Sequence, residues 1–293
     1  MTNQTRHTQL SDLGLIRVSG EDAASFLHNL LTNDINHLEE GQVRHAALCT
    51  AKGRMVATFL VWHEGNDFLL QLSADILPGI IKKLSMYILR SKVKLTDISS
   101  ERVQFGLLHS TIGPATPMSC HPYQGGSAIR LDALRCIVTV PAELAGDVQT
   151  AWGTSAPLSD WHLAEIRAGI PRVMAVTQEA FVPQMVNYEV SAVGGVNFQK
   201  GCYPGQEIVA RTQYLGKIKR RMLRVKLADY AVPGTDIFIP EAGDQHCGAI
   251  VLTAPSPEGG FESLLVSQHS ATLHVGSPSG PLAQPLDLPY TVE

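Results

Sequence analysis

Long apolar runs, net charge and paired cysteines are all scarce in this 293-residue chain. The most apolar stretches (59–62, 68–72 and 76–89) are short or carry lysine and arginine, so none is expected to span a bilayer. The N-terminus lacks the apolar run of a secretory signal peptide, which predicts a cytoplasmic or equivalent reducing location. No internal repeat occurs, and the Gly-Gly pairs lack the spacing of a nucleotide-binding loop.

The cysteines exclude two further classes of protein. There are five, an odd number, widely spaced and without a C-x-x-C pair, which excludes a disulfide framework and a zinc ribbon. The histidines also lack the spacing of a metal site, and no metal is expected. Four cysteines are expected to be buried as small apolar residues, and Cys202 is considered separately below. The four are Cys49, Cys120, Cys136 and Cys247.

The composition that is present indicates a globular protein. Hydrophobic residues make up 44% of the chain and charged residues 17%, which is too little charge for a disordered protein. A chain of this length is expected to form two or three domains. The net charge of -4 gives no nucleic-acid signature, so no DNA binding is expected.

The charge is unevenly distributed. Between Lys200 and Lys226 there are eight basic residues and one acid, a net charge of +7, which leaves -11 on the rest of the chain. This basic strip is expected to attract an anionic ligand or partner. The alternative for 217–226, which we favour, is that most of these side chains only alternate outward on a strand. Arg211 is kept as a ligand contact.

Periodicity predicts mixed helices and strands. The α+β class follows from hairpins interspersed with two helices over 46–150. One long helix is expected to be capped by Ser73 or Asp75 and to end near Leu89, and 111–126, rich in proline, glycine and serine, reads as loop. Strands are predicted at 13–18, 43–50, 55–62, 68–72, 92–96, 103–109, 135–140, 196–198, 222–227, 236–240, 248–253 and 263–266, and further helices at 26–31, 141–152, 159–168 and from 206.

One motif carries most of the functional information. Residues 196–211 read Val-Asn-Phe-Gln-Lys-Gly-Cys-Tyr-Pro-Gly-Gln-Glu-Ile-Val-Ala-Arg, a predicted strand, a glycine turn and the start of a helix. Cys202 lies two residues after Lys200 and just ahead of the helix N-terminus, and both features favour the nucleophilic thiolate. The alternative is a cysteine that only packs beside the turn. The pattern leaves both interpretations open.

This motif resembles the signature of the YgfZ family, folate-binding relatives of the glycine-cleavage T-protein, a tetrahydrofolate-dependent aminomethyltransferase. The matching residues are Lys200 to Glu207, Lys-Gly-Cys-Tyr-Pro-Gly-Gln-Glu, followed by Arg211. The resemblance extends over 18–34, 167–171 and the C-terminal strands, whereas 97–150 match only in general pattern.

The resemblance implies a T-protein-like three-domain ring. The expected parts are a discontinuous folate-binding domain (1–45 plus 140–212), a ferredoxin-like α+β domain (46–139) and a C-terminal β-barrel (213–293). It also implies a monomer that binds tetrahydrofolate or a one-carbon derivative and assists iron–sulfur proteins or their assembly machinery, including radical enzymes that modify tRNA.

The family's site residues carry over by position. Cys202 matches the critical thiol, with Lys200 beside it, and Gly201 and Gly205 match the structural glycines. For Asn33 and Asp34 the alternative is that they only end a helix. The residues expected at the folate cavity are Tyr203, Gln206, Glu207, Arg211, Asn33 and Asp34.

Two departures from the family patterns bear on function. Ala57 and Thr58 stand where the T-protein has an acidic pair, and neither can supply a carboxylate for proton handling. Met185 stands where the family is expected to show glutamate more often. A folate-dependent aminomethyl or one-carbon transferase, or a demethylase, is therefore the disfavoured alternative. A third alternative is a scaffold in which Cys202 only packs.

Overall fold

The computed structural model describes residues 5–268 and 272–292, which form two compact units. Of the described residues, the first comprises 5–46, 59–161 and 200–203, and the second comprises 47–58, 162–199, 204–268 and 272–292. Both units are therefore discontinuous in sequence. The chain changes unit inside two strands, β3 (Val43–Cys49) and β4 (Met55–Glu64), inside helix α4 (Leu158–Ala168), and on either side of 200–203.

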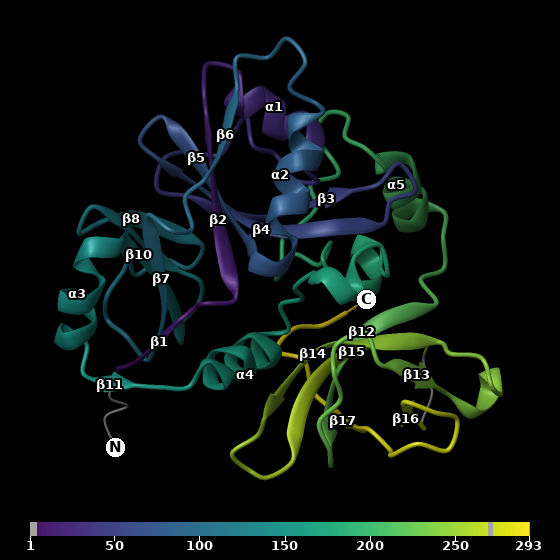
Figure 1. The fold of residues 1–293 in the computed structure, drawn as a ribbon. Helices are drawn as coiled ribbons and strands as arrows, with labels where there is room; N and C mark the ends of the chain where they lie inside the picture. The colour runs from purple at the N-terminus through teal and green to yellow at the C-terminus, as the bar shows by residue number, and fades with distance from the viewer. Residues whose placement is uncertain (1–4, 269–271, 293) are drawn as a thin grey trace. The chain divides into compact units, whose positions relative to one another are not determined.

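A mostly antiparallel sheet with the order β3-β4-β5-β2-β6 lies largely in the first unit (Figure 1). Its central strands are apolar on both faces, because helices α1 and α2 contact the sheet. Trp62 of β4 is fully buried. The remaining members are β2 (Leu13–Ser19), β5 (Asp67–Ser73), β6 (Lys94–Asp97), α1 (Ala23–Leu30) and α2 (Leu77–Ser85), the last preceded by a 3₁₀ turn (Ala74–Ile76).

A second sheet of the first unit has the order β11-β1-β7-β10-β9-β8. Helix α3 (Ala145–Ala151) contributes to its core, where Phe105 and Trp152 meet edge to face with ring centroids 5.2 Å apart. The strands are β1 (Arg6–Gln9), β7 (Arg102–Leu108), β8 (Ser119–Tyr123), β9 (Gly126–Arg130), β10 (Arg135–Pro141) and β11 (Thr154–Ser155).

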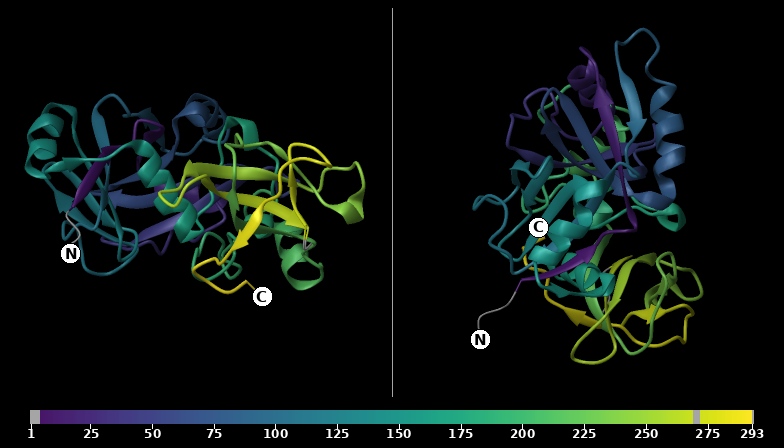
Figure 2. Two further views of the ribbon diagram at one scale, coloured as in Figure 1. Left: turned by 90° about the horizontal axis from the view of Figure 1, so that it is seen from below. Right: turned by 60° about the vertical axis from the view of Figure 1, so that its left-hand side comes forward.

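The second unit contains a six-stranded sheet ordered β16-β13-β14-β15-β12-β17. Strands β12, β14 and β15 lie side by side in both views of Figure 2 and pair antiparallel. Helix α5 (Gln206–Tyr214) lies in this unit, as does α4 from His162 onward. The strands are β12 (Arg220–Leu227), β13 (Asp236–Phe238), β14 (Gly248–Pro255), β15 (Phe261–Gln268), β16 (His274–Val275) and β17 (Gln284–Leu286).

Four local predictions were wrong. Residues 119–123 form strand β8 rather than loop, and 196–198 form no strand. Helix α2 ends at Ser85, because the residues beyond it face solvent and Leu89 is 89% exposed with a left-handed φ of 44°. The Ser73 side chain makes no capping hydrogen bond, since the helix begins with a 3₁₀ turn.

None of the helices in the described part of the chain is both long enough and apolar enough to cross a membrane.

Candidate functional site

Cys202 stands apart from the other cysteines. All five lie among the described residues, and Cys202 alone is exposed. Burial raises the pKa of Cys49 to about 12 and that of Cys136 to about 11, which makes these thiols poor nucleophiles. The four buried cysteines thus behave as predicted. Cys202 is not a buried packing residue, and its role as a reactive thiol stays a prediction.

Lys200 is held by the C-terminal end of α1. Its Nζ donates hydrogen bonds to the carbonyl oxygens of His28 and Leu31, the latter at 2.9 Å. The same nitrogen lies 4.8 Å from the centroid of the buried Tyr203 ring. Helix C-terminal carbonyls and an aromatic face both favour a cation at this position.

Burial nevertheless lowers the pKa of Lys200 to about 8, against the opposing effects of Asp34 and Cys202. At pH 7 Lys200 is therefore still mainly protonated, and it loses its charge as the pH rises past about 8. The motif thus places a cation two residues from an exposed thiol.

Asp34 organises the polar groups around this lysine. One carboxylate oxygen lies 3.0 Å from Nδ1 of His28, and the other lies 2.7 Å from Nδ1 of His37. Burial acts to raise the pKa of Asp34, but hydrogen bonds with His37 outweigh it and the pKa is lowered. Burial, then the charge of Lys200, lowers the pKa of His28. A neutral imidazole thus connects Asp34 to the motif.

His28 also lies against Gly201. A Cβ built at Gly201 would stand 3.5 Å from Nε2 of His28, an ordinary van der Waals distance. Sequence reasoning missed His28 and His37, because 172 residues separate His28 from Lys200 and no local spacing reveals the contact.

The described residues contain no group of three histidine, cysteine, aspartate or glutamate side chains that could hold a metal ion.

Asn33 is buried and internally bonded. Its amide nitrogen donates to the carbonyl oxygen of His45 at 2.7 Å, and its Oδ1 accepts from the Asp34 backbone N–H at 2.8 Å. These bonds fix the turn after α1. A folate contact by Asn33 or Asp34 stays a prediction.

The helix of the motif begins as predicted. Gly205 precedes α5 with a left-handed φ of 83°, and a Cβ there would lie 2.3 Å from the Thr50 carbonyl oxygen. Only glycine fits this close approach of two backbones. Along α5, Glu207 and Arg211 are both exposed, and they form no ion pair with any residue in the described ranges. Both remain available to a ligand.

Thr58 has a structural role at the position of the missing acid. Its side chain is buried, and its Oγ1 accepts a hydrogen bond of 3.1 Å from the Val173 backbone N–H. Ala57, beside it, is fully buried. Neither residue offers an ionisable group at this point of β4, in agreement with the interpretation of the sequence.

Comparison with known proteins identifies the family. The tRNA-modifying protein YgfZ of Vibrio vulnificus is 31% identical over 241 residues, which are 78% of this chain and 73% of that protein. The protein of the same name from Photobacterium profundum is 34% identical over 250 residues, 80% of this chain and 72% of that one. The chain belongs to the YgfZ family.

The fold of this YgfZ family member is that of a T-protein. Residues 2–116 match the family model of the GCVT N-terminal domain. The glycine cleavage system aminomethyltransferase T from Bartonella henselae superposes with a TM-score of 0.77 over 97% of this chain and 85% of that one, at 15% identity. The predicted α+β, T-protein-like fold class is thereby confirmed. The division into three domains with the bounds given above stays a prediction.

Proposed function

We propose that this protein is a tetrahydrofolate-binding accessory factor that assists the assembly or repair of iron–sulfur proteins, including radical enzymes that modify tRNA, with Cys202 as its reactive residue. The curated relatives are named for tRNA modification. The observation that carries the proposal is the exposed Cys202 thiol next to a lysine held by α1 and Tyr203. We place this activity in the cytoplasm.

The residues of α5 fit a folate in part. Tetrahydrofolate carries the carboxylates of its glutamate tail and the hydrogen-bonding groups of its pterin ring. Arg211, exposed and free of ion pairs within the described chain, would bind a carboxylate of that tail. Glu207, equally free, would accept hydrogen bonds from pterin N–H groups. When bound, the folate would supply or accept a one-carbon unit.

The transferase alternative has less support. Aminomethyl transfer of the T-protein type needs a carboxylate where this chain has Thr58, whose hydroxyl is hydrogen bonded to the backbone of Val173. An assay for one-carbon release from aminomethyl or methylated donors tests this directly. Turnover by the purified protein would establish the transferase, and we expect none.

Complementation tests the role of Cys202. In a bacterial strain lacking its own YgfZ, the wild-type chain is expected to restore iron–sulfur enzyme activity. The activity that Cys202→Ala restores is expected to be at least tenfold lower. The matched control is Gln199→Ala, an exposed side chain three residues earlier in the same segment. Full rescue by Cys202→Ala would exclude the thiol from the function.

Folate binding is tested separately by isothermal titration of tetrahydrofolate into the purified protein. We expect saturable binding that weakens in Arg211→Ala and persists in Cys202→Ala. Absence of saturable binding in the wild type would refute the folate part of the proposal and leave the thiol part standing.

A further inference from the structure

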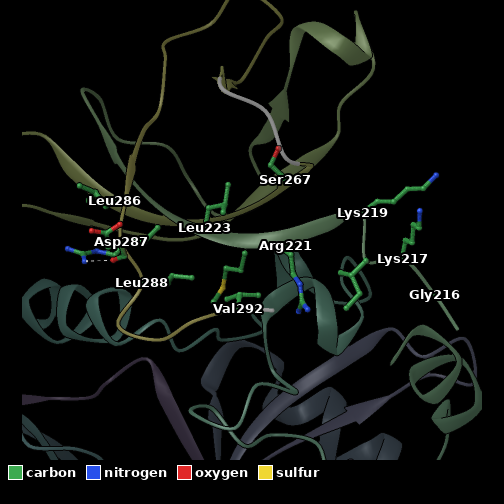
Figure 3. Close-up of a pocket in the computed structure, with 13 residues that line it drawn as sticks. Gly216, Lys217, Lys219, Arg221, Leu223, Ser267, Leu286, Asp287, Leu288 and Val292 are labelled. Atoms are coloured by element: carbon green, nitrogen blue, oxygen red, sulfur yellow. Dashed lines mark hydrogen bonds between the residues drawn. The ribbon is translucent and has the colours of Figure 1, made fainter. Parts of the chain in front are cut away.

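A large pocket lies along one face of β12, entirely within the second unit (Figure 3). Its volume is about 690 Å³, within the range of sites that bind small molecules. The segment between α5 and β12, β12 itself and the C-terminal segment line it. Much of the lining is aliphatic and comprises Ile218, Met222, Leu223, Leu286, Leu288 and Val292.

The pocket is positively charged at one end. Lys217 and Lys219 are exposed there, and neither makes a hydrogen bond or ion pair with the residues that the structure describes (Figure 3). The arginines of the lining differ, because Arg221 pairs with Glu189 and Arg224 pairs with Glu262. The two lysines are thus the cations whose charge is still uncompensated.

Acidic groups do little to offset these lysines. Asp287 is the one acidic residue among the described lining residues, and its backbone oxygen accepts a 3.0 Å hydrogen bond from Arg224. In Figure 3 this bond lies at the opposite end of the pocket from Lys217 and Lys219. The pocket therefore combines an aliphatic floor with a cationic end, which complements a molecule that is apolar at one end and anionic at the other.

The lining favours a small molecule over a nucleic acid strand. Proteins that bind single-stranded nucleic acid stack its bases on aromatic side chains. No aromatic residue lines this pocket within the described chain. The -11 charge of the rest of the protein would also repel a long polyanion.

We propose that this pocket binds a small organic anion, whose apolar body lies on the aliphatic floor and whose carboxylate, sulfonate or phosphate group is held by Lys217 and Lys219. The site gives a function to the basic strip, most of which the sequence left as an outward-facing strand surface. It does not depend on Cys202 or on the proposed folate contacts.

The test uses 8-anilinonaphthalene-1-sulfonate, an aromatic sulfonate whose fluorescence rises in apolar sites. The full-length protein is expected to bind it saturably. Lys217→Ala with Lys219→Ala is expected to weaken binding at least fivefold, the factor given by one unit charge at contact distance in water. The control pair is Lys82→Ala with Lys83→Ala, neighbouring lysines of α2 that do not line the pocket.

Two further probes keep the proposal falsifiable. The neutral analogue N-phenyl-1-naphthylamine should bind with the same affinity to the wild type and to the lysine double variant. Leu288 is half-buried on the floor of the pocket, and Leu288→Asp should weaken the binding of both probes. Unchanged affinity in the lysine double variant would overturn the proposal. Stronger displacement of the sulfonate by a ten-nucleotide RNA than by tetrahydrofolate or benzoate would overturn it in favour of a nucleic-acid site.

Displacement also separates two sources of the anion. Tetrahydrofolate is itself an organic anion with an aromatic body, and competition by it would assign the pocket to the folate. Displacement by small aryl carboxylates but not by tetrahydrofolate would support a separate ligand.

Discussion

Lys200 determines how the Cys202 thiol should respond to pH. A nearby ammonium group makes a thiol more reactive, so Lys200→Met is expected to slow iodoacetamide alkylation of Cys202 measurably at pH 7. Because the pKa of Lys200 is about 8, the wild type loses this charge above that pH, and the two rates should converge. Lys200→Arg keeps the charge and should retain most of the rate. Identical pH profiles for wild type and Lys200→Met would remove the electrostatic role.

His45 makes stability depend on pH. Burial, then the charge of Arg135, lowers its pKa from 6.5 to about 4. Between these values the unfolded chain binds a proton that the native chain does not, so the free energy of unfolding falls as the pH drops from 6.5 to 4. Once the pH is below both pKa values, this proton costs the native state about 3 kcal/mol of unfolding free energy. His45→Gln should reduce the difference between urea unfolding at pH 7 and pH 4.5, whereas the exposed His121→Gln should not.

At the scale of single elements, the start of α5 depends on Gly205. Gly205→Ala would combine a left-handed φ with a Cβ 2.3 Å from the Thr50 carbonyl oxygen. Gly65→Ala is the matched control, because Gly65 has a φ of 62° and no atom within 4 Å of the added Cβ. The control should cost about 1–2 kcal/mol of unfolding free energy, and Gly205→Ala clearly more. If both variants lost the same free energy of unfolding in urea, the backbone around Gly205 would be able to move and accommodate the added Cβ.

Element types were predictable where one local pattern decides them. Strands β2 to β5 follow from apolar runs, and α4 ends at Ala168 as predicted, just before Gly169, whose φ is 66°. Strand β8 was missed because Pro122 and the surrounding polar residues read as loop. It is an edge strand, where proline is tolerated, and its pairing partner β9 supplies the order that its own sequence lacks.

The candidate site was predictable only in its contiguous part. Lys200, Cys202 and Tyr203 belong to one motif, so the sequence alone could bring them together. The support from His28, Leu31 and Asp34 comes from another part of the chain through backbone carbonyls and imidazole nitrogens. Contacts made by backbone carbonyls or by single imidazole nitrogens produce no periodic pattern in the sequence. Long-range polar contacts of this kind become visible only when the fold is known.

At the scale of the whole molecule, the sequence predicts that 213–293 form a domain of their own, and removing these residues tests that prediction. A fragment of residues 1–212 would lose the partners of buried groups in the second unit. The side-chain amide of the fully buried Asn187 donates a hydrogen bond of 3.0 Å to the Met222 carbonyl oxygen. The buried Glu189 carboxylate forms an ion pair with Arg221. An unsatisfied buried group costs about 1–3 kcal/mol, and a broken buried ion pair about 3–5 kcal/mol.

Those losses are comparable with the whole stability of an ordinary domain, about 5–15 kcal/mol. The fragment also loses Glu262, which accepts a hydrogen bond of 3.0 Å from Arg167 of α4. We therefore expect residues 1–212 to show no cooperative unfolding transition by circular dichroism in urea, whereas the full chain does. A cooperative transition in the fragment would mean that the C-terminal strands add to a fold that forms without them. Its absence would mean that 162–199 depend on these strands, which supply the partners of the buried Asn187 amide and Glu189 carboxylate.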